Sequence, residues 1–246
     1  MSGLLYKNFC INRSSMIFTL VTAIACSLTL ILMVLFGYTL RGITPSEEDI
    51  PSLLTASSAC YFLAFWLPSM ASATLFQADE NKTCCAFAMS LPQGAKGHVE
   101  AKYYYLLMQA LVILFITFIT DTILTGMLGG TVSTTSVLPL LFSLHILLAA
   151  VEIPFMIRFG ADRGLQIKGG VILAVFALVA LYFLFGDISW LIENEDDPLA
   201  ALMTWLGSGD IIFWLSLFPY FSIAAYYISC KLSVKVFRKG AESYEQ

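Results

Sequence analysis

Two acidic side chains, Asp121 and Glu152, stand inside long apolar runs of the sequence. A carboxylate is costly to place in hydrocarbon, so an acid that is kept there is by default a candidate for function. The chemistry it offers is contact with a cationic group of a substrate. The alternative is a protonated or threonine-bonded acid that stabilises helix packing, and Thr117 and Thr125 lie one helical turn from Asp121 on the same face.

Residues that serve enzymatic chemistry are scarce. The sequence has two histidines, His98 and His145, and no HExxH motif. The stretch Gly94-Ala95-Lys96-Gly97 lacks the spacing and the hydroxyl residue of a phosphate-binding loop. Cys84 and Cys85 are adjacent, which is not the CxxC spacing of a redox or metal site. We therefore expect no catalytic residue, no metal or cofactor bound by this chain and no nucleic-acid partner.

The longest polar interruption between apolar runs is residues 76–102, FQADENKTCCAFAMSLPQGAKGHVEAK. Asp79 is suited to cap a short helix over 79–89, because its carboxylate accepts hydrogen bonds from the free amides of the first turn. Leu91-Pro92 would end that helix, since the residue before proline avoids helical angles. The apolar block around Phe87 predicts a covered contact rather than a solvated loop, with Phe87 as its anchor.

Long apolar segments must position these groups. Of 246 residues, 59% are hydrophobic and 12% charged, whereas soluble domains carry roughly 25% charged residues. About 20 apolar residues suffice to cross a bilayer as a helix. The sequence therefore predicts an all-α integral membrane protein with six spans in one domain over residues 1–246. The expected spans are 14–40, 52–75, 103–128, 137–159, 169–186 and 211–230.

The first residues predict a short amphipathic helix on the inner membrane surface. Leu4, Leu5 and Phe9 would share its apolar face, and Lys7 and Asn8 would point elsewhere.

Charge distribution predicts the orientation of the spans. With both termini inside, 12 of the 13 basic residues are cytoplasmic and only Arg41 is outside, which satisfies the positive-inside rule. This count places Lys102 and Lys168 in cytoplasmic loops. The acidic loop 187–210 is then outside, and its apolar part is expected to form a short interfacial helix.

Two stretches resemble a known family. Residues 3–9, GLLYKNF, resemble the GLLxKDF opening of short type-2 (ABC-2) ABC transporter permeases, with Asn8 where Asp is more usual. The central loop is similar to that family's F–x2–DE, SLP and V–x2–KY sequence. The matching residues are Phe76, Asp79-Glu80, Ser90-Leu91-Pro92, Val99 and Ala101-Lys102-Tyr103.

The resemblance implies a type V exporter-like transmembrane domain in a bacterial cell membrane. Such a permease pairs with a second permease copy and with two separate ATPase chains, which carry ATP and Mg. The implied substrates are antimicrobial, amphipathic or toxin-like peptides, and loop 76–102 would be the coupling helix. The expected coupling residues are Phe76, Asp79, Glu80, Phe87, Met89, Leu91 and Pro92, and the substrate-path candidates are Asp121 and Glu152.

Other classes stay open at this point. An ATP-independent channel or carrier would need more polar residues along a path than two carboxylates. A drug- or ion-exporting ABC permease and a structural or assembly membrane protein are further alternatives.

Overall fold

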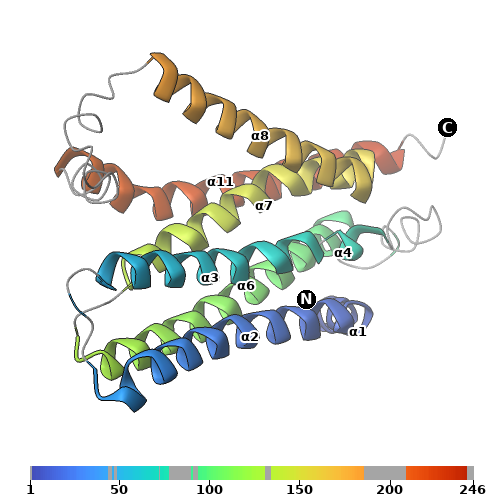
Figure 1. Cartoon of the computed structure of the whole chain (residues 1–246). Coiled ribbons are helices and arrows are strands. Elements are labelled where there is room, and N and C mark those ends of the chain that lie inside the picture. The colour runs from blue at the N-terminus through green and yellow to red at the C-terminus, as the bar shows by residue number, and fades with distance from the viewer. Residues whose placement is uncertain are drawn as a thin grey trace.

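The computed structural model of the chain describes residues 2–43, 46, 49–71, 73–77, 90, 94–130, 134–185 and 209–242. All regular elements in these ranges are helices, and six of them are long and apolar enough to cross a membrane (Figure 1). The expected all-α class with six spans is thus confirmed. The helices are α1 (Ser2–Ile11), α2 (Arg13–Gly37), the 3-10 turn η1 (Thr39–Arg41), α3 (Asp49–Ala71), α4 (Thr74–Gln77), α6 (Gly94–Met127), α7 (Val137–Phe159), α8 (Ala161–Phe185) and α11 (Gly209–Glu242).

The bundle has two distinct ends. Helix α1, helix α4, the start of α6 and the last turns of α11 all lie at one end, which we call the basal end (Figure 1). The opposite, distal end carries η1, the start of α3 and the end of α8. Since six spans return the chain to the side from which it started, the two termini are expected at one end, as observed.

The core has a large basal cluster, a distal cluster and a small third cluster of Ala64, Phe65 and Ile113 between α3 and α6. The basal cluster packs α6 against α4, α7 and α11 through Phe76, Val99 and Ile153. The distal cluster packs α2 and α3 against α6 and α7, and its members include Leu30 and Tyr61. Helix α8 begins beside the end of α7 and then diverges from the rest of the bundle (Figure 1).

Several helices extend beyond the expected spans. Helix α6 begins at Gly94, so the last part of the expected 76–102 loop is already helical and continuous with the third span. Helix α8 begins at Ala161 rather than near residue 169, and α11 continues to Glu242, through the stretch expected to be a polar tail. These extensions carry charged or polar residues that a hydropathy pattern assigns to loops.

Helix α1 is present, but one expectation about its faces is wrong. Asn8, which was expected to point away from the apolar face, is buried. The reason is that α1 packs against α6, where the edge of the Phe9 ring meets the Tyr105 ring with 5.1 Å between centroids. More of the helix circumference is covered than on a helix that lies alone on a membrane surface.

Candidate functional site

Four neighbouring residues of α6 bury polar heads in the interior of the basal half. They are Lys102, Tyr103, Tyr105 and Gln109, all at most 3% exposed, and we call them the α6 hub. Burying a polar or charged group is unfavourable unless it is hydrogen-bonded. Each hub residue accordingly has a partner elsewhere in the chain: on α4, on α11, on α2 or at the junction between α1 and α2.

Lys102 contacts the end of the second span. Its Nζ donates a hydrogen bond to the Leu75 carbonyl at 2.7 Å and lies 4.6 Å from the centroid of the Phe76 ring. A carbonyl oxygen and the face of an aromatic ring both attract a cation. Phe76, an expected coupling residue, is only 2% exposed, and the Lys102 ammonium lies over its ring.

Tyr103 contacts α11. Its hydroxyl forms hydrogen bonds with the hydroxyls of Ser229 (2.8 Å) and Ser233 (2.7 Å), and the Tyr226 hydroxyl donates to the Tyr103 carbonyl at 2.8 Å. Ser229 in turn donates to the carbonyl of Ala150 in α7. This network joins the third, fourth and sixth spans through backbone as well as side-chain groups.

Tyr105 and Gln109 contact the N-terminal part of the chain. The Tyr105 hydroxyl donates to the carbonyl of Asn12, between α1 and α2, at 3.2 Å. The Gln109 amide donates to the hydroxyl of Thr19 in α2. In about two turns, α6 thus makes polar contacts with α4, α11, the α1–α2 junction and α2.

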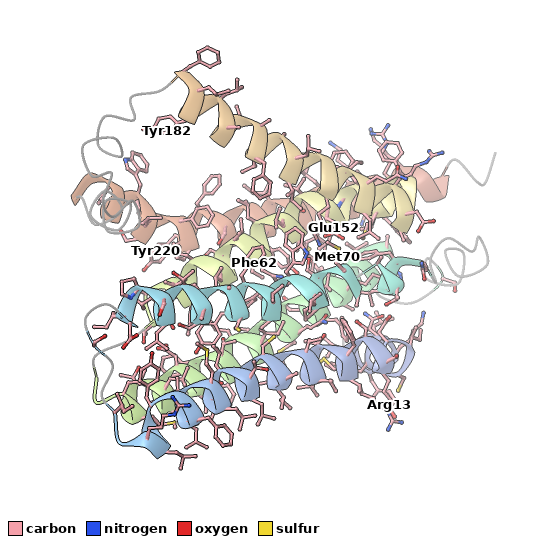
Figure 2. All side chains as sticks on the ribbon, in the orientation of Figure 1. Arg13, Phe62, Met70, Glu152, Tyr182 and Tyr220 are labelled. Atoms are coloured by element: carbon pink, nitrogen blue, oxygen red, sulfur yellow. The ribbon has the colours of Figure 1, made fainter. Side chains whose placement is uncertain are left out.

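A second polar site joins α7, α8 and α3. Glu152 and Lys168 form a buried ion pair with 2.8 Å between Oε2 and Nζ, and Glu152 lies between α7 and α8 (Figure 2). Lys168 also donates to the Ser69 carbonyl at 3.1 Å and to the Ser69 hydroxyl. The expectation that Lys168 lies in a turn is wrong: it lies within α8 and is buried, because Glu152 and Ser69 supply the partners that make its burial possible. The expectation that Lys102 lies in a loop is wrong as well. It lies within α6, and the Leu75 carbonyl and the Phe76 ring are the partners that make its burial possible.

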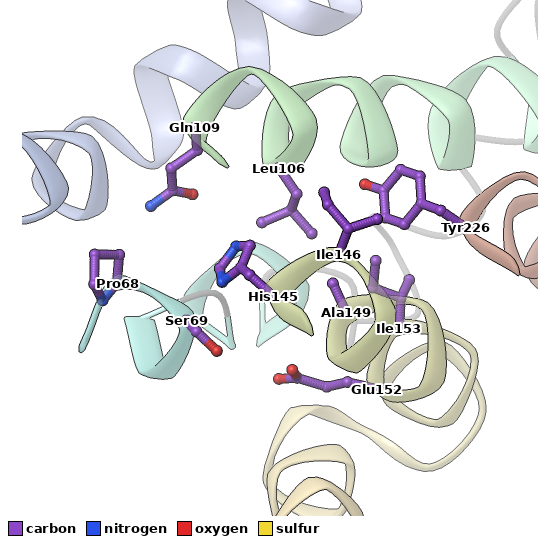
Figure 3. Close-up of a pocket in the computed structure, with 10 residues that line it drawn as sticks. All are labelled: Pro68, Ser69, Leu106, Gln109, His145, Ile146, Ala149, Glu152, Ile153 and Tyr226. Carbon is purple, nitrogen blue, oxygen red and sulfur yellow. The ribbon is translucent and has the colours of Figure 1, made fainter. Parts of the chain in front are cut away.

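A cavity of about 10 Å³ adjoins this ion pair. Figure 3 shows Ser69, Gln109, His145 and Glu152 around it, from α3, α6 and α7. The His145 ring packs against Phe65 at 5.8 Å and forms a hydrogen bond with the Phe65 backbone. This is about the space needed to hold a single water molecule. A substrate group could reach Glu152 only after Lys168 and the surrounding helices had moved.

Asp121 accepts hydrogen bonds from threonines. Its Oδ1 accepts hydrogen bonds from the Thr134 amide at 3.0 Å and from the Thr134 hydroxyl, and its Oδ2 accepts from the Thr135 hydroxyl at 2.6 Å. These threonines immediately precede α7, so Asp121 ties the start of α7 to α6. Thr117, the neighbour expected from sequence, donates to carbonyls of its own helix. The geometry is that of a threonine-bonded packing acid.

The other expected coupling residues lie outside the described part of the chain. These are Asp79, Glu80, Phe87, Met89, Leu91 and Pro92, and the short helix expected within 187–210 lies outside it as well. Sequence reasoning missed the hub residues Tyr105 and Gln109. Both are polar residues within an apolar run, and this could have indicated buried hydrogen bonds. They follow Lys102-Tyr103, which was interpreted only as part of a family motif.

Six membrane-spanning helices held together by buried polar groups define a multi-pass membrane protein. The family model described as ABC-2 family transporter protein matches residues 52–238, about three quarters of the chain. The chain therefore belongs to the ABC-2 transporter family, whose members are membrane subunits of ABC transporters. Searches of curated proteins and of solved structures found no match.

Proposed function

We propose that this chain is the permease subunit of an ABC exporter that moves antimicrobial, amphipathic or toxin-like peptides across a bacterial plasma membrane. The observation that carries this proposal is the ABC-2 family match over residues 52–238, which takes in five of the six candidate spans and both intramembrane acids. The peptide class rests on the resemblance of residues 3–9 and 76–103. A single transmembrane domain would comprise the whole chain.

ATP hydrolysis is assigned to a separate ATPase chain that docks on residues 76–102. The sequence lacks a phosphate-binding loop, so ATP and Mg would be held by that partner. The α6 hub supports the proposal, because it fixes both ends of this loop. Lys102 bonds the Leu75 carbonyl where the loop begins, and α6 carries the chain away from Gly94 where the described helix resumes.

The basal end is assigned to the cytoplasm. Exposed basic residues gather there on the end of α7, the start of α8 and the last turns of α11. They are Arg158, Arg163, Lys231, Lys235, Arg238 and Lys239. Cytoplasmic surfaces of membrane proteins carry an excess of Lys and Arg. A cytoplasmic ATPase would then meet the 76–102 loop at this end.

The permease is proposed to act as a pair of identical chains with two ATPase chains. Supporting this, α8 and α11 expose rows of large apolar side chains, among them Phe176, Phe185 and Phe221. Lipid covers such a surface in a monomer, and a second copy would cover part of it in a dimer.

The test replaces Phe87, the expected anchor of the docking loop. We expect Phe87→Ala to lower both co-purification of the ATPase and ATP-dependent uptake of a labelled cationic amphipathic peptide into inside-out vesicles. Phe87→Asp should lower both further, because it places a charge in an apolar contact. Phe36→Ala, at an exposed position near the end of α2, is the control and should change neither. If both Phe87 variants keep wild-type ATPase binding and uptake, the docking role of this loop is wrong.

A further inference from the structure

We infer that Lys102 is a positioning residue that transmits movement of the 76–102 loop to the helix bundle. The inference rests on the proposed function, since the movement would come from the ATPase docked on that loop. It names a specific side chain for the connection between the loop and the spans.

The contact geometry makes Lys102 suited to sense the position of α4. A hydrogen bond of 2.7 Å to the Leu75 carbonyl and an approach of 4.6 Å to the Phe76 ring fix the ammonium from two directions. Because the bond is made to a backbone carbonyl, its length depends directly on the position of the α4 backbone relative to α6. Leu75 and Phe76 are the last buried residues before the undescribed part of the loop. They therefore lie where a displacement of the loop would enter the bundle from the second span.

A charge at this position has no packing advantage. Lys102 is 2% exposed, and an uncharged chain of similar length, such as methionine, would fill the same space without the desolvation of an ammonium. A directional bond between a cation and a carbonyl does what methionine cannot: it favours one relative placement of α4 and α6. The charge is therefore explained by positioning rather than by volume.

The rest of the hub continues the connection. Tyr103, the next residue, binds α11 through Ser229 and Ser233, and Tyr105 and Gln109 bind the α1–α2 junction and α2. All four residues stand on one helix, which moves as a rigid element. A shift of α6 imposed through Lys102 would thus reach the first and last spans together. Coupling between distant sites travels through such contiguous contacts when they have two arrangements.

The experiment measures whether nucleotide on the ATPase still moves the distal ends of the spans. Spin labels are placed at Leu40 and Phe185, both exposed at the distal end, after replacement of the six native cysteines. The permease–ATPase complex is reconstituted in lipid nanodiscs, and label distances are recorded without nucleotide and with ATP and vanadate. The variants are Lys102→Met and Lys102→Arg. Lys235→Met is the control, because Lys235 is an exposed lysine of α11 outside the docking loop.

In the wild type and in Lys235→Met, we expect ATP and vanadate to populate a new distance. In Lys102→Met, the ATPase should still co-purify and hydrolyse ATP, but the population ratio of new to resting distance should fall about 2- to 30-fold, the range typical of coupling residues. Lys102→Arg keeps a cationic donor and should restore most of the ratio. A purely structural lysine would not separate ATP hydrolysis from the distance change.

Each other outcome has a defined meaning. A wild-type ratio in Lys102→Met overturns the inference and leaves the proposed function standing. Absence of any ATPase from the wild-type preparation overturns the proposed function and the inference with it. If Lys102→Met does not fold, Phe76→Leu decides, since it keeps the carbonyl bond and removes the aromatic face. A smaller fall in the ratio supports the inference, and a wild-type ratio contradicts it.

Discussion

Helices α6 and α8 are both long, apolar and able to span a membrane, yet they are held in opposite ways. Helix α6 buries a polar group against one neighbour after another, while its opposite face exposes apolar side chains such as Phe115. Helix α8 is buried along one short row, Ala161, Gly164 and Lys168, and beyond it exposes large apolar side chains such as Phe185, which is 84% exposed. Figure 2 shows these side chains projecting on both sides of the α8 ribbon.

The contrast shows what fixes a helix in this protein. Apolar side chains gain little by leaving lipid for a helix interface, so association depends on close backbone approach and on polar groups. Helix α6 has several such attachments and is fixed within one chain. The described contacts of helix α8 gather near its start. They include the Glu152–Lys168 ion pair, the hydrogen bonds from Lys168 to Ser69 and the close contact of Gly164 with Met156. The remaining surface of α8 is left for lipid or for a second copy.

The largest expected effect comes from breaking the ion pair of α8. Lys168→Met leaves Glu152 as a buried charge without its cation and should lower the free energy of unfolding by about 3–5 kcal/mol. The double variant Glu152→Gln/Lys168→Met removes both charges and should recover most of that loss. The measurement is unfolding of the purified protein by titration with sodium dodecyl sulfate. Equal losses in the single and double variants would show that the pair does not hold α8.

A smaller effect is expected at the close contact. A Cβ on Gly164 would lie 3.1 Å from the Met156 Cα and closer still to the Met156 Cγ. Gly164→Ala should therefore force α7 and α8 apart at a cost of about 1–3 kcal/mol. Gly169 and Gly170 in the same helix have open space at the Cβ position. Gly170→Ala is the matched control and should be neutral or slightly stabilising, because alanine favours the helix. A control that loses as much stability as Gly164→Ala would contradict the contact.

The smallest expected effect belongs to a single attachment of α6. Tyr103→Phe removes the hydroxyl that bonds Ser229 and Ser233 and should lower the free energy of unfolding by about 0.5–1.5 kcal/mol. The loss is limited because the other hub residues still fix α6. Tyr104→Phe alters an exposed neighbour and should change nothing in the same titration. If Tyr103→Phe lowered the free energy of unfolding by several kcal/mol, the position of α6 would depend mainly on this one contact.

Much of this architecture could be predicted from the sequence. Six apolar runs of spanning length locate the helices, because apolar stretches of that length with few or no charges are typical of membrane-spanning helices. The buried lysines could not be predicted in the same way. Lys102 and Lys168 directly precede the apolar runs 103–128 and 169–186 and so have the pattern of loop residues. Only the fold brings the Leu75 carbonyl and Glu152 to them.

For the two intramembrane acids, the sequence likewise predicts the position but not the partners. Asp121 and Glu152 were correctly expected inside the bundle, and both are buried there. Their partners were not foreseen. Thr134 and Thr135 lie across a turn from Asp121, and Lys168 lies on the next helix from Glu152, so neither set follows from spacing along one helix face. Whether either acid also contacts substrate stays a prediction.

Site-specific photo-crosslinking in membranes tests whether an ATPase binds the basal end through residues 76–102. A photoreactive amino acid is placed at Phe87 in one variant and at Phe185, at the distal end, in another. The predicted result is a crosslink from position 87 to a chain with a Walker phosphate-binding motif, identified by mass spectrometry, and none from position 185. No ATPase at position 87, or equal crosslinking from both positions, would contradict the claim.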